Sequence, residues 1–109
     1  VIGHGPHVLR GVEWNGGALV AHSLGNLVTY GPFKHDGYRG HGAILCGTLG
    51  ADGTMREASL RSTIQHTPGL VQSDPEHRGA FDIAELSRID FPGTGARVGA
   101  TGELTRPPK

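Results

Sequence analysis

The chain has 109 residues, with ten basic and ten acidic side chains, seven histidines and a formal net charge of zero. This balance gives no electrostatic support for nucleic acid binding, and no apolar run approaches the roughly 20 residues that a membrane-spanning helix needs. The lone Cys46 excludes a disulfide framework and a cysteine-based zinc site. We therefore expect no nucleic acid partner and no membrane span in these residues.

The first residues carry the most informative local pattern, His4-Gly5-Pro6-His7, which directly follows the apolar pair Val1-Ile2. Imidazole is the commonest protein ligand for transition metals and binds through a neutral ring nitrogen. A Gly-Pro spacer favours a tight turn, so both rings can converge at the end of a strand. The pattern predicts a pair of metal ligands. The alternative is a pair of solvated or hydrogen-bonded histidines.

Two β-hairpins are expected after this turn. Residues 8–14 and 18–23 form the strands of the first hairpin, joined by the Gly-rich turn at 15–17. A surface loop follows at 31–42, and a second hairpin joins residues 43–49 to residues 54–64 through a turn at 50–53. Alternation in the last strand places Ala58, Leu60 and Ile64 on one face and residues 57, 59, 61 and 63 on the other.

One helix is expected late in the chain. Ser73-Asp74 suits its N-cap, Pro75 and Glu76 suit its first turn, and residues 91–93 stop it. An apolar stripe on this helix would pack on the sheet; it consists of Ala80, Ile83, Leu86 and Ile89. Residues 96–101 can form a short last strand, and we expect the polar residues 105–109 to be a disordered tail.

The remaining histidines give weaker signals. His22, at the end of the first hairpin, either lines the same site as His4 or replaces an aromatic packing residue. His35 and His41 lie in a Gly-rich loop that we expect to be solvated, with a border of a substrate cleft as the alternative. His66 and His77 are expected on the surface.

The N-terminal segment resembles the closing motif of the bacterial capsule-synthesis (CapA, poly-γ-glutamate synthesis) family. Members carry a "GH-x-PHV-x-x-x-E" stretch, a short turn with glycine, and then "SLGN". The residues that match are Gly3, His4, Pro6, His7, Val8, Glu13, Ser23, Leu24, Gly25 and Asn26. The similarity covers about 26 residues and weakens after Gly31.

The resemblance implies an α+β fold, the β-rich C-terminal part of a metallophosphatase-like α/β/β/α sandwich with antiparallel hairpins and one late helix. It also implies a centre of divalent metal ions for which His4 and His7 are ligands, with His22 and Asn26 as possible lining residues. The catalytic residues stay unassigned. The two histidines are separated by two residues, whereas one is usual among phosphatases, which makes His4 the stronger candidate.

We expect residues 1–104 to be the C-terminal portion of such a domain, truncated at its N-terminus and inactive alone, because the acidic and Asn motifs that open these domains are missing. The N-terminal remainder would supply the other metal ligands. A complete small β domain is the alternative.

Two functions fit this resemblance. One is metal-dependent hydrolysis of a phosphoester-type substrate, and the other is non-catalytic binding or export of an anionic polymer. The resemblance implies a location at the cell envelope or outside the cytoplasm.

Overall fold

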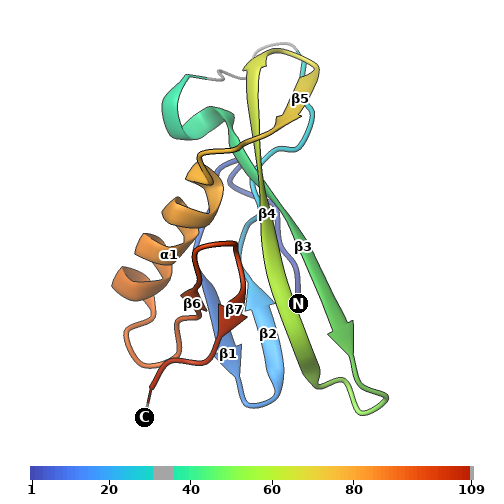
Figure 1. Ribbon diagram of the computed structural model, residues 1–109, viewed down its shortest axis with the longest axis vertical. Helices are drawn as coiled ribbons and strands as arrows, with labels where there is room; N and C mark the ends of the chain where they lie inside the picture. The colour runs from blue at the N-terminus through green and yellow to red at the C-terminus, as the bar shows by residue number, and fades with distance from the viewer. Residues whose placement is uncertain (31–35, 109) are drawn as a thin grey trace.

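The computed structural model describes residues 1–30 and 36–108, and its regular elements are mostly short antiparallel strands. In chain order they are β1 (Val12–Asn15), β2 (Ala18–Ala21), the 3₁₀ turn η1 (Gly37–Gly40), β3 (His41–Leu49), β4 (Met55–Thr67), β5 (Leu70–Ser73), α1 (Arg78–Asp90), β6 (Arg97–Val98) and β7 (Leu104–Thr105). Every strand pair is antiparallel, and α1 is the only α-helix among the described residues (Figure 1). The predicted β-rich α+β class is confirmed. None of the described helices is long and apolar enough to cross a membrane.

The first hairpin pairs β1 with β2 through the predicted turn, where Gly16 has a φ of 60°. Its two outer edges are also occupied. Ile2 forms a parallel bridge to Ala21 of β2, and Gly95 forms an antiparallel bridge to Glu13 of β1. Residues from both ends of the chain therefore flank the hairpin, and the segment that precedes His4 runs alongside β2.

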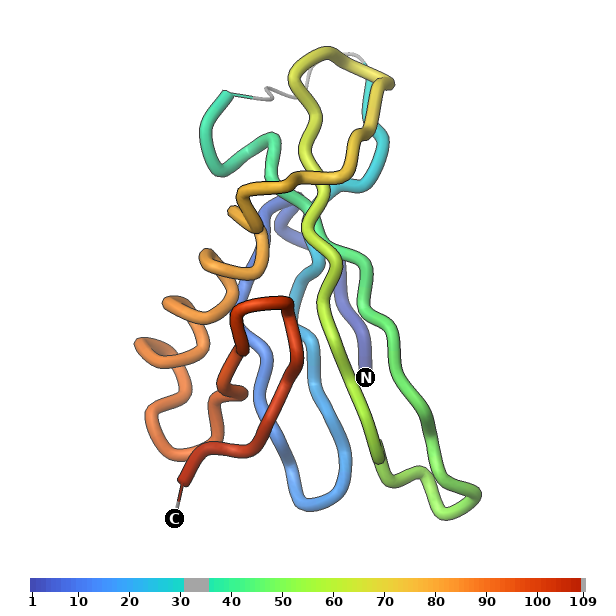
Figure 2. Tube along the Cα trace, in the orientation of Figure 1, coloured from blue at the N-terminus to red at the C-terminus, as the bar shows by residue number. Residues whose placement is uncertain are grey.

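The second hairpin is a long ribbon of β3 and β4, and β5 extends it to three strands. It runs along most of the long axis of the molecule (Figure 2). The predicted alternation holds from Ala58 to Arg61, but Thr63, predicted on the exposed face, is buried, and so is Gln65 beyond it. Residues 26–30 cover that part of β4, where the backbone N–H of Thr29 donates to Gln65 Oε1 at 2.9 Å. Sequence alternation cannot predict such a covering segment.

Helix α1 begins at Arg78, later than the capping signal suggested, yet Asp74 still caps its start. The carboxylate of Asp74 accepts the backbone N–H groups of Glu76 and Arg78, both at 3.0 Å. The predicted apolar stripe is only partly correct. Ala80 and Ile83 are buried, whereas Ile89 is 60% exposed.

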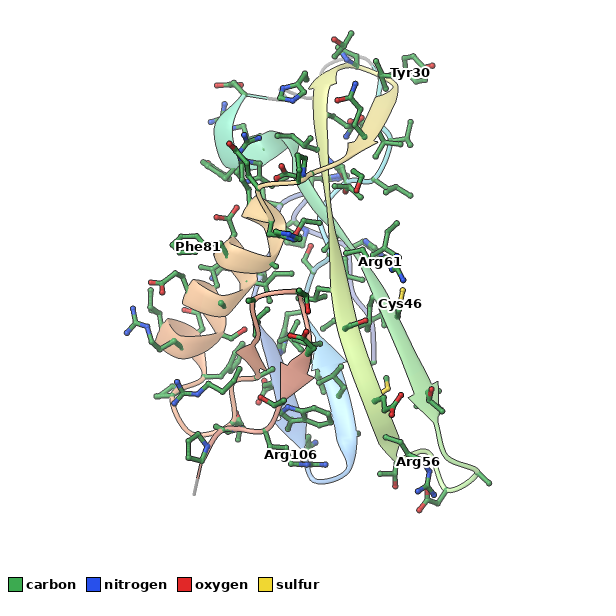
Figure 3. All side chains as sticks on the ribbon, viewed as in Figure 1. Tyr30, Cys46, Arg56, Arg61, Phe81 and Arg106 are labelled. Carbon is green, nitrogen blue, oxygen red and sulfur yellow. The ribbon has the colours of Figure 1, made fainter. Side chains whose placement is uncertain are left out.

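The buried face of α1 continues through Ser87 and not through Ile89. The Ser87 hydroxyl donates to the carbonyl of Ile83 at 2.6 Å and accepts the backbone N–H of Val12 at 2.9 Å. Because both bonds are satisfied, a polar residue can occupy the core and join the helix to β1. Phe81 projects from the opposite side of the helix (Figure 3).

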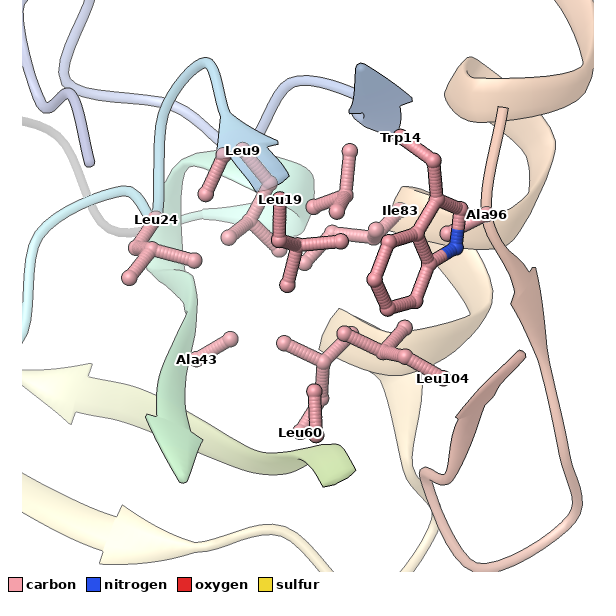
Figure 4. Packing of buried hydrophobic residues seen from close by; sticks show 12 residues of the cluster. Leu9, Trp14, Leu19, Leu24, Ala43, Leu60, Ile83, Ala96 and Leu104 are labelled. Carbon is pink, nitrogen blue, oxygen red and sulfur yellow. The ribbon is translucent and has the colours of Figure 1, made fainter. Parts of the chain in front are cut away.

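The core lies where the first hairpin, the ribbon, the helix and the C-terminal segment meet (Figure 4). The hairpin region contributes leucines and Trp14, the ribbon contributes Ala43 and Leu60, and α1 contributes Ile83.

The segment expected to be a disordered tail starts within β7. Trp14 Nε1 donates to the carbonyl of Thr105 at 3.2 Å, and the Arg106 guanidinium lies over the Trp14 ring.

Candidate functional site

The expected tight turn is present at residues 4–7. The backbone N–H of His7 donates to the carbonyl of His4 at 3.2 Å, and the turn follows the extended residues that pair with β2. His7 has a φ of 62°, a left-handed conformation that non-glycine residues seldom adopt. Such strain persists only where surrounding contacts fix the residue, and it concentrates at functional sites. Both imidazoles are exposed.

The loop that follows β2 holds both imidazoles through consecutive residues. His4 Nδ1 lies 3.2 Å from the carbonyl oxygen of Gly25, and His7 Nδ1 lies 2.9 Å from Oδ1 of Asn26. The structure therefore brings His4, His7 and Asn26 close together, with Asn26 as a hydrogen-bond partner of His7.

These contacts determine which nitrogen of each imidazole can bind a metal. A carbonyl oxygen and an amide oxygen carry no hydrogen, so each Nδ1 must be the protonated donor. In the neutral ring the lone pair is then on Nε2. Metal-binding histidines commonly have this arrangement, with one nitrogen donating to an oxygen and the other ligating the ion. The donor chemistry of His4 and His7 thus fits a metal ion bound through Nε2.

The residue 23–26 loop is itself firmly positioned. Ser23 is fully buried, and its hydroxyl accepts the backbone N–H of Gly25 at 3.2 Å. Leu24 donates its N–H to the carbonyl of Gly3 at 3.2 Å and accepts the N–H of Ala43 at 3.2 Å. The oxygens that orient the two imidazoles therefore belong to a loop anchored to the N-terminal segment and to β3.

Gly25 is required in this loop for two reasons. Its φ is +71°, and a Cβ atom there would lie 2.9 Å from the carbonyl oxygen of His41. A side chain at this position would be strained and would also collide with backbone that cannot swing away. The close approach links the loop that holds His4 to the first residue of β3.

His22, the other possible lining residue, makes its ring contacts elsewhere. Its Nε2 lies 2.8 Å from Oε2 of Glu13, and its ring stacks on Phe91 with centroids 4.7 Å apart. The hydroxyl of Thr94 donates to the other oxygen of Glu13 at 2.9 Å. Hydrogen bonds from His22 and then from Thr94 hold the pKa of Glu13 below its usual value. The cluster joins the hairpin to the end of α1.

His41 has a partner that sequence reasoning missed. Its Nδ1 lies 2.5 Å from Oδ2 of Asp82 in α1, and its side chain is only 14% exposed. The expectation of a solvated loop is therefore wrong at His41, which begins β3; His35 lies outside the described residues. Asp82 stands 41 residues away in a helix, and no local pattern could have indicated this pair.

The described residues contain no cluster of three or more His, Cys, Asp or Glu side chains arranged to hold a metal ion. His4 and His7 can thus provide two nitrogen donors, and Gly25 and Asn26 orient them. Two imidazoles are fewer than the ligands that a catalytic metal centre requires.

Comparison with known proteins finds a match for the N-terminal segment alone. No curated protein matches the chain. Residues 1–30 match the family described as "Bacterial capsule synthesis protein PGA_cap", and this segment includes His4, His7 and the loop that orients them. The resemblance seen in the motif is confirmed, and the first 30 residues carry the signature of the bacterial capsule-synthesis family.

Proposed function

We propose that this chain is part of a capsule-synthesis protein with a metallophosphatase-like fold, in which His4 and His7 bind a divalent metal ion. The observation that supports this most is the orientation of both rings by consecutive residues. Oxygens of Gly25 and Asn26 accept hydrogen bonds from the two Nδ1 atoms, and a neutral imidazole that donates through Nδ1 carries its lone pair on Nε2. All four residues lie within the segment that matches the family.

The proposed reaction is hydrolysis of a phosphoester-type bond at the cell envelope. A divalent ion bound there would activate a water molecule and stabilise the charge that develops on the oxygens of the substrate. The residues of this chain hold the ion and fix the orientation of its imidazole ligands. Carboxylates and further ligands would come from the N-terminal remainder of the domain, so the 109-residue chain alone should be inactive and should bind metal weakly.

A second candidate is non-catalytic binding or export of an anionic polymer. The description of the matching family favours it, because that description names capsule synthesis and no hydrolytic reaction. In this case the full-length protein would bind polymer without phosphodiesterase activity. An assay of metal content and phosphodiesterase activity on the full-length protein separates the two candidates.

The metal assignment predicts distinct effects of two substitutions in the full-length protein. His4→Ala should lower the affinity for Mn²⁺ or Zn²⁺ at least tenfold, because it removes a metal–nitrogen bond. Asn26→Ala should lower the affinity by about 10–100-fold, the usual effect of losing an outer-shell partner. Asn26→Asp retains an oxygen acceptor for His7 Nδ1 and should recover most of the affinity. Isothermal titration calorimetry measures all three.

Thermal melts with and without a chelator provide the control. Bound metal stabilises the folded state, so chelator should lower the melting temperature of the wild type more than that of His4→Ala. His66→Ala, at an exposed position on β4, should respond to chelator as the wild type does. Equal chelator shifts in the wild type and His4→Ala would show that His4 holds no metal.

A further inference from the structure

A second cluster of basic side chains lines an open pocket of about 640 Å³ beside the start of β3. Its walls come from η1, the facing ends of β3 and β4, and the first residue of α1. The polar side chains that line it are Asp36, His41, His66 and Arg78. This cluster includes neither His4 nor His7.

His41 is the most rigidly held of these groups. Its Nδ1–H donates to the Asp82 carboxylate at 2.5 Å, and Asp82 does not line the pocket. The carboxylate thus fixes the ring from behind, and Nε2 is the nitrogen available to a ligand in the pocket.

Arg78 provides a permanent positive charge in the same pocket. Its guanidinium contacts Glu76 and lies 3.8 Å from the buried carboxylate of Asp74, while the side chain remains 38% exposed. These contacts hold the side chain in place, so little side-chain entropy is lost when a ligand binds.

The acidic groups around the pocket are already paired. Asp36, the only carboxylate among the described residues that line the pocket, is 79% exposed and lies 3.9 Å from Arg39 of η1. Behind the wall, the buried carboxylate of Asp74 lies near Arg78, and the partly exposed carboxylate of Asp82 contacts His41. Apart from Asp36, the polar groups that face a ligand are nitrogen-bearing side chains from three elements: His41 on β3, His66 on β4 and Arg78 on α1.

We propose that this pocket binds a phosphate group, held by Arg78 and by the imidazoles of His41 and His66. Arginine forms short, charge-assisted hydrogen bonds to phosphate oxygens. The site does not depend on a metal ion at His4.

Titration with inorganic phosphate in the presence of EDTA tests the site, with ¹H–¹⁵N NMR shifts as the readout and ionic strength held constant with chloride. The wild type should show saturable binding of phosphate at pH 6. His41→Gln should weaken this binding at least fivefold. Arg78→Gln should also weaken it at least fivefold.

Two controls separate this pocket from general charge effects and from the metal proposal. Arg56→Gln removes an exposed charge near the far end of the ribbon and should leave phosphate binding unchanged. His4→Ala should also bind phosphate normally, so a failure of the metal assignment would not affect this result. If His41→Gln does not fold, His66→Gln at an exposed position provides the same comparison.

The proposal is overturned if phosphate causes no saturable shift at pH 6. It is equally overturned if Arg56→Gln weakens binding as much as His41→Gln, since the effect would then be general screening. Acetate at the same ionic strength should bind at least fivefold more weakly than phosphate, and equal binding of the two would contradict a phosphate site.

Discussion

Gly25→Ala should destabilise the protein by about 2–5 kcal/mol and should disturb both candidate metal ligands. The left-handed backbone conformation costs a residue with a Cβ about 1–2 kcal/mol. The collision with the His41 carbonyl, 2.9 Å from the added atom, adds about 1–3 kcal/mol of overpacking. Relief of this collision must move the Gly25 carbonyl that accepts from His4 Nδ1. Chemical denaturation measures the loss of stability, and the ¹⁵N shifts of the His4 ring report the changed hydrogen bond.

Gly5→Ala is the matched control within the same motif. A Cβ at Gly5 would meet no atom within 4 Å, and its backbone does not adopt a left-handed conformation. Its effect should therefore stay within about 0.5 kcal/mol, the usual range for surface substitutions. Equal losses from the two alanine variants would show that the close approach to His41 does not hold the loop in place.

The sequence predicted the local conformation of the N-terminal turn, but not the contacts that orient its two imidazoles. The Gly-Pro spacer in His4-Gly5-Pro6-His7 predicts a tight turn, and the structure contains this turn. The orientation of the rings depends on Gly25 and Asn26, about twenty residues away. The family resemblance grouped both segments in one motif, but no spacing rule predicts which ring nitrogen each oxygen would contact.

The hairpins could be predicted because their turns have strong local signals. The buried face of α1 could not be predicted in the same way. Glycines at 16 and 53 adopt the positive φ values that such turns require. The apolar stripe on α1 was extended to Ile89 on periodicity alone. The core instead accepts Ser87, whose hydroxyl has both a donor and an acceptor partner, and Ile89 is exposed.

The two proposed sites both depend on the loop that contains Gly25, and the sequence gives no sign of this connection. Gly25 carries the carbonyl that orients His4 and packs against the carbonyl of His41, whose ring lines the pocket that we propose binds phosphate. A shift of this loop would therefore affect both sites. Substitutions that remove one imidazole ring, such as His4→Ala and His41→Gln, leave the shared backbone in place. They can therefore test the two sites separately.

Asp74→Ala should cost about 2–3 kcal/mol of stability at neutral pH. The Asp74 side chain is only 1% exposed and accepts backbone N–H groups of Glu76 and Arg78 at the start of α1. Losing a helix cap costs up to about 2 kcal/mol, and removing the acceptor of the second, partly buried N–H group adds about 1 kcal/mol. Asp52→Ala is the control, because Asp52 accepts the N–H of Thr54 at an exposed turn and should matter much less.

The effect of Asp74→Ala should also depend on pH in a definite direction. Burial raises the pKa of Asp74, but the two backbone N–H groups and the charges of Arg78 and His41 outweigh it, so the net pKa lies below the usual 3.8. A carboxyl group whose pKa is lowered on folding stabilises the protein above its unfolded pKa and loses that contribution as the pH falls through the folded value. The difference in unfolding free energy between wild type and Asp74→Ala should thus be constant from pH 7 to about pH 5 and shrink below about pH 4. Urea denaturation across this range measures it, and a difference that stays constant down to pH 2.5 would show that the ionised carboxylate does not cap α1.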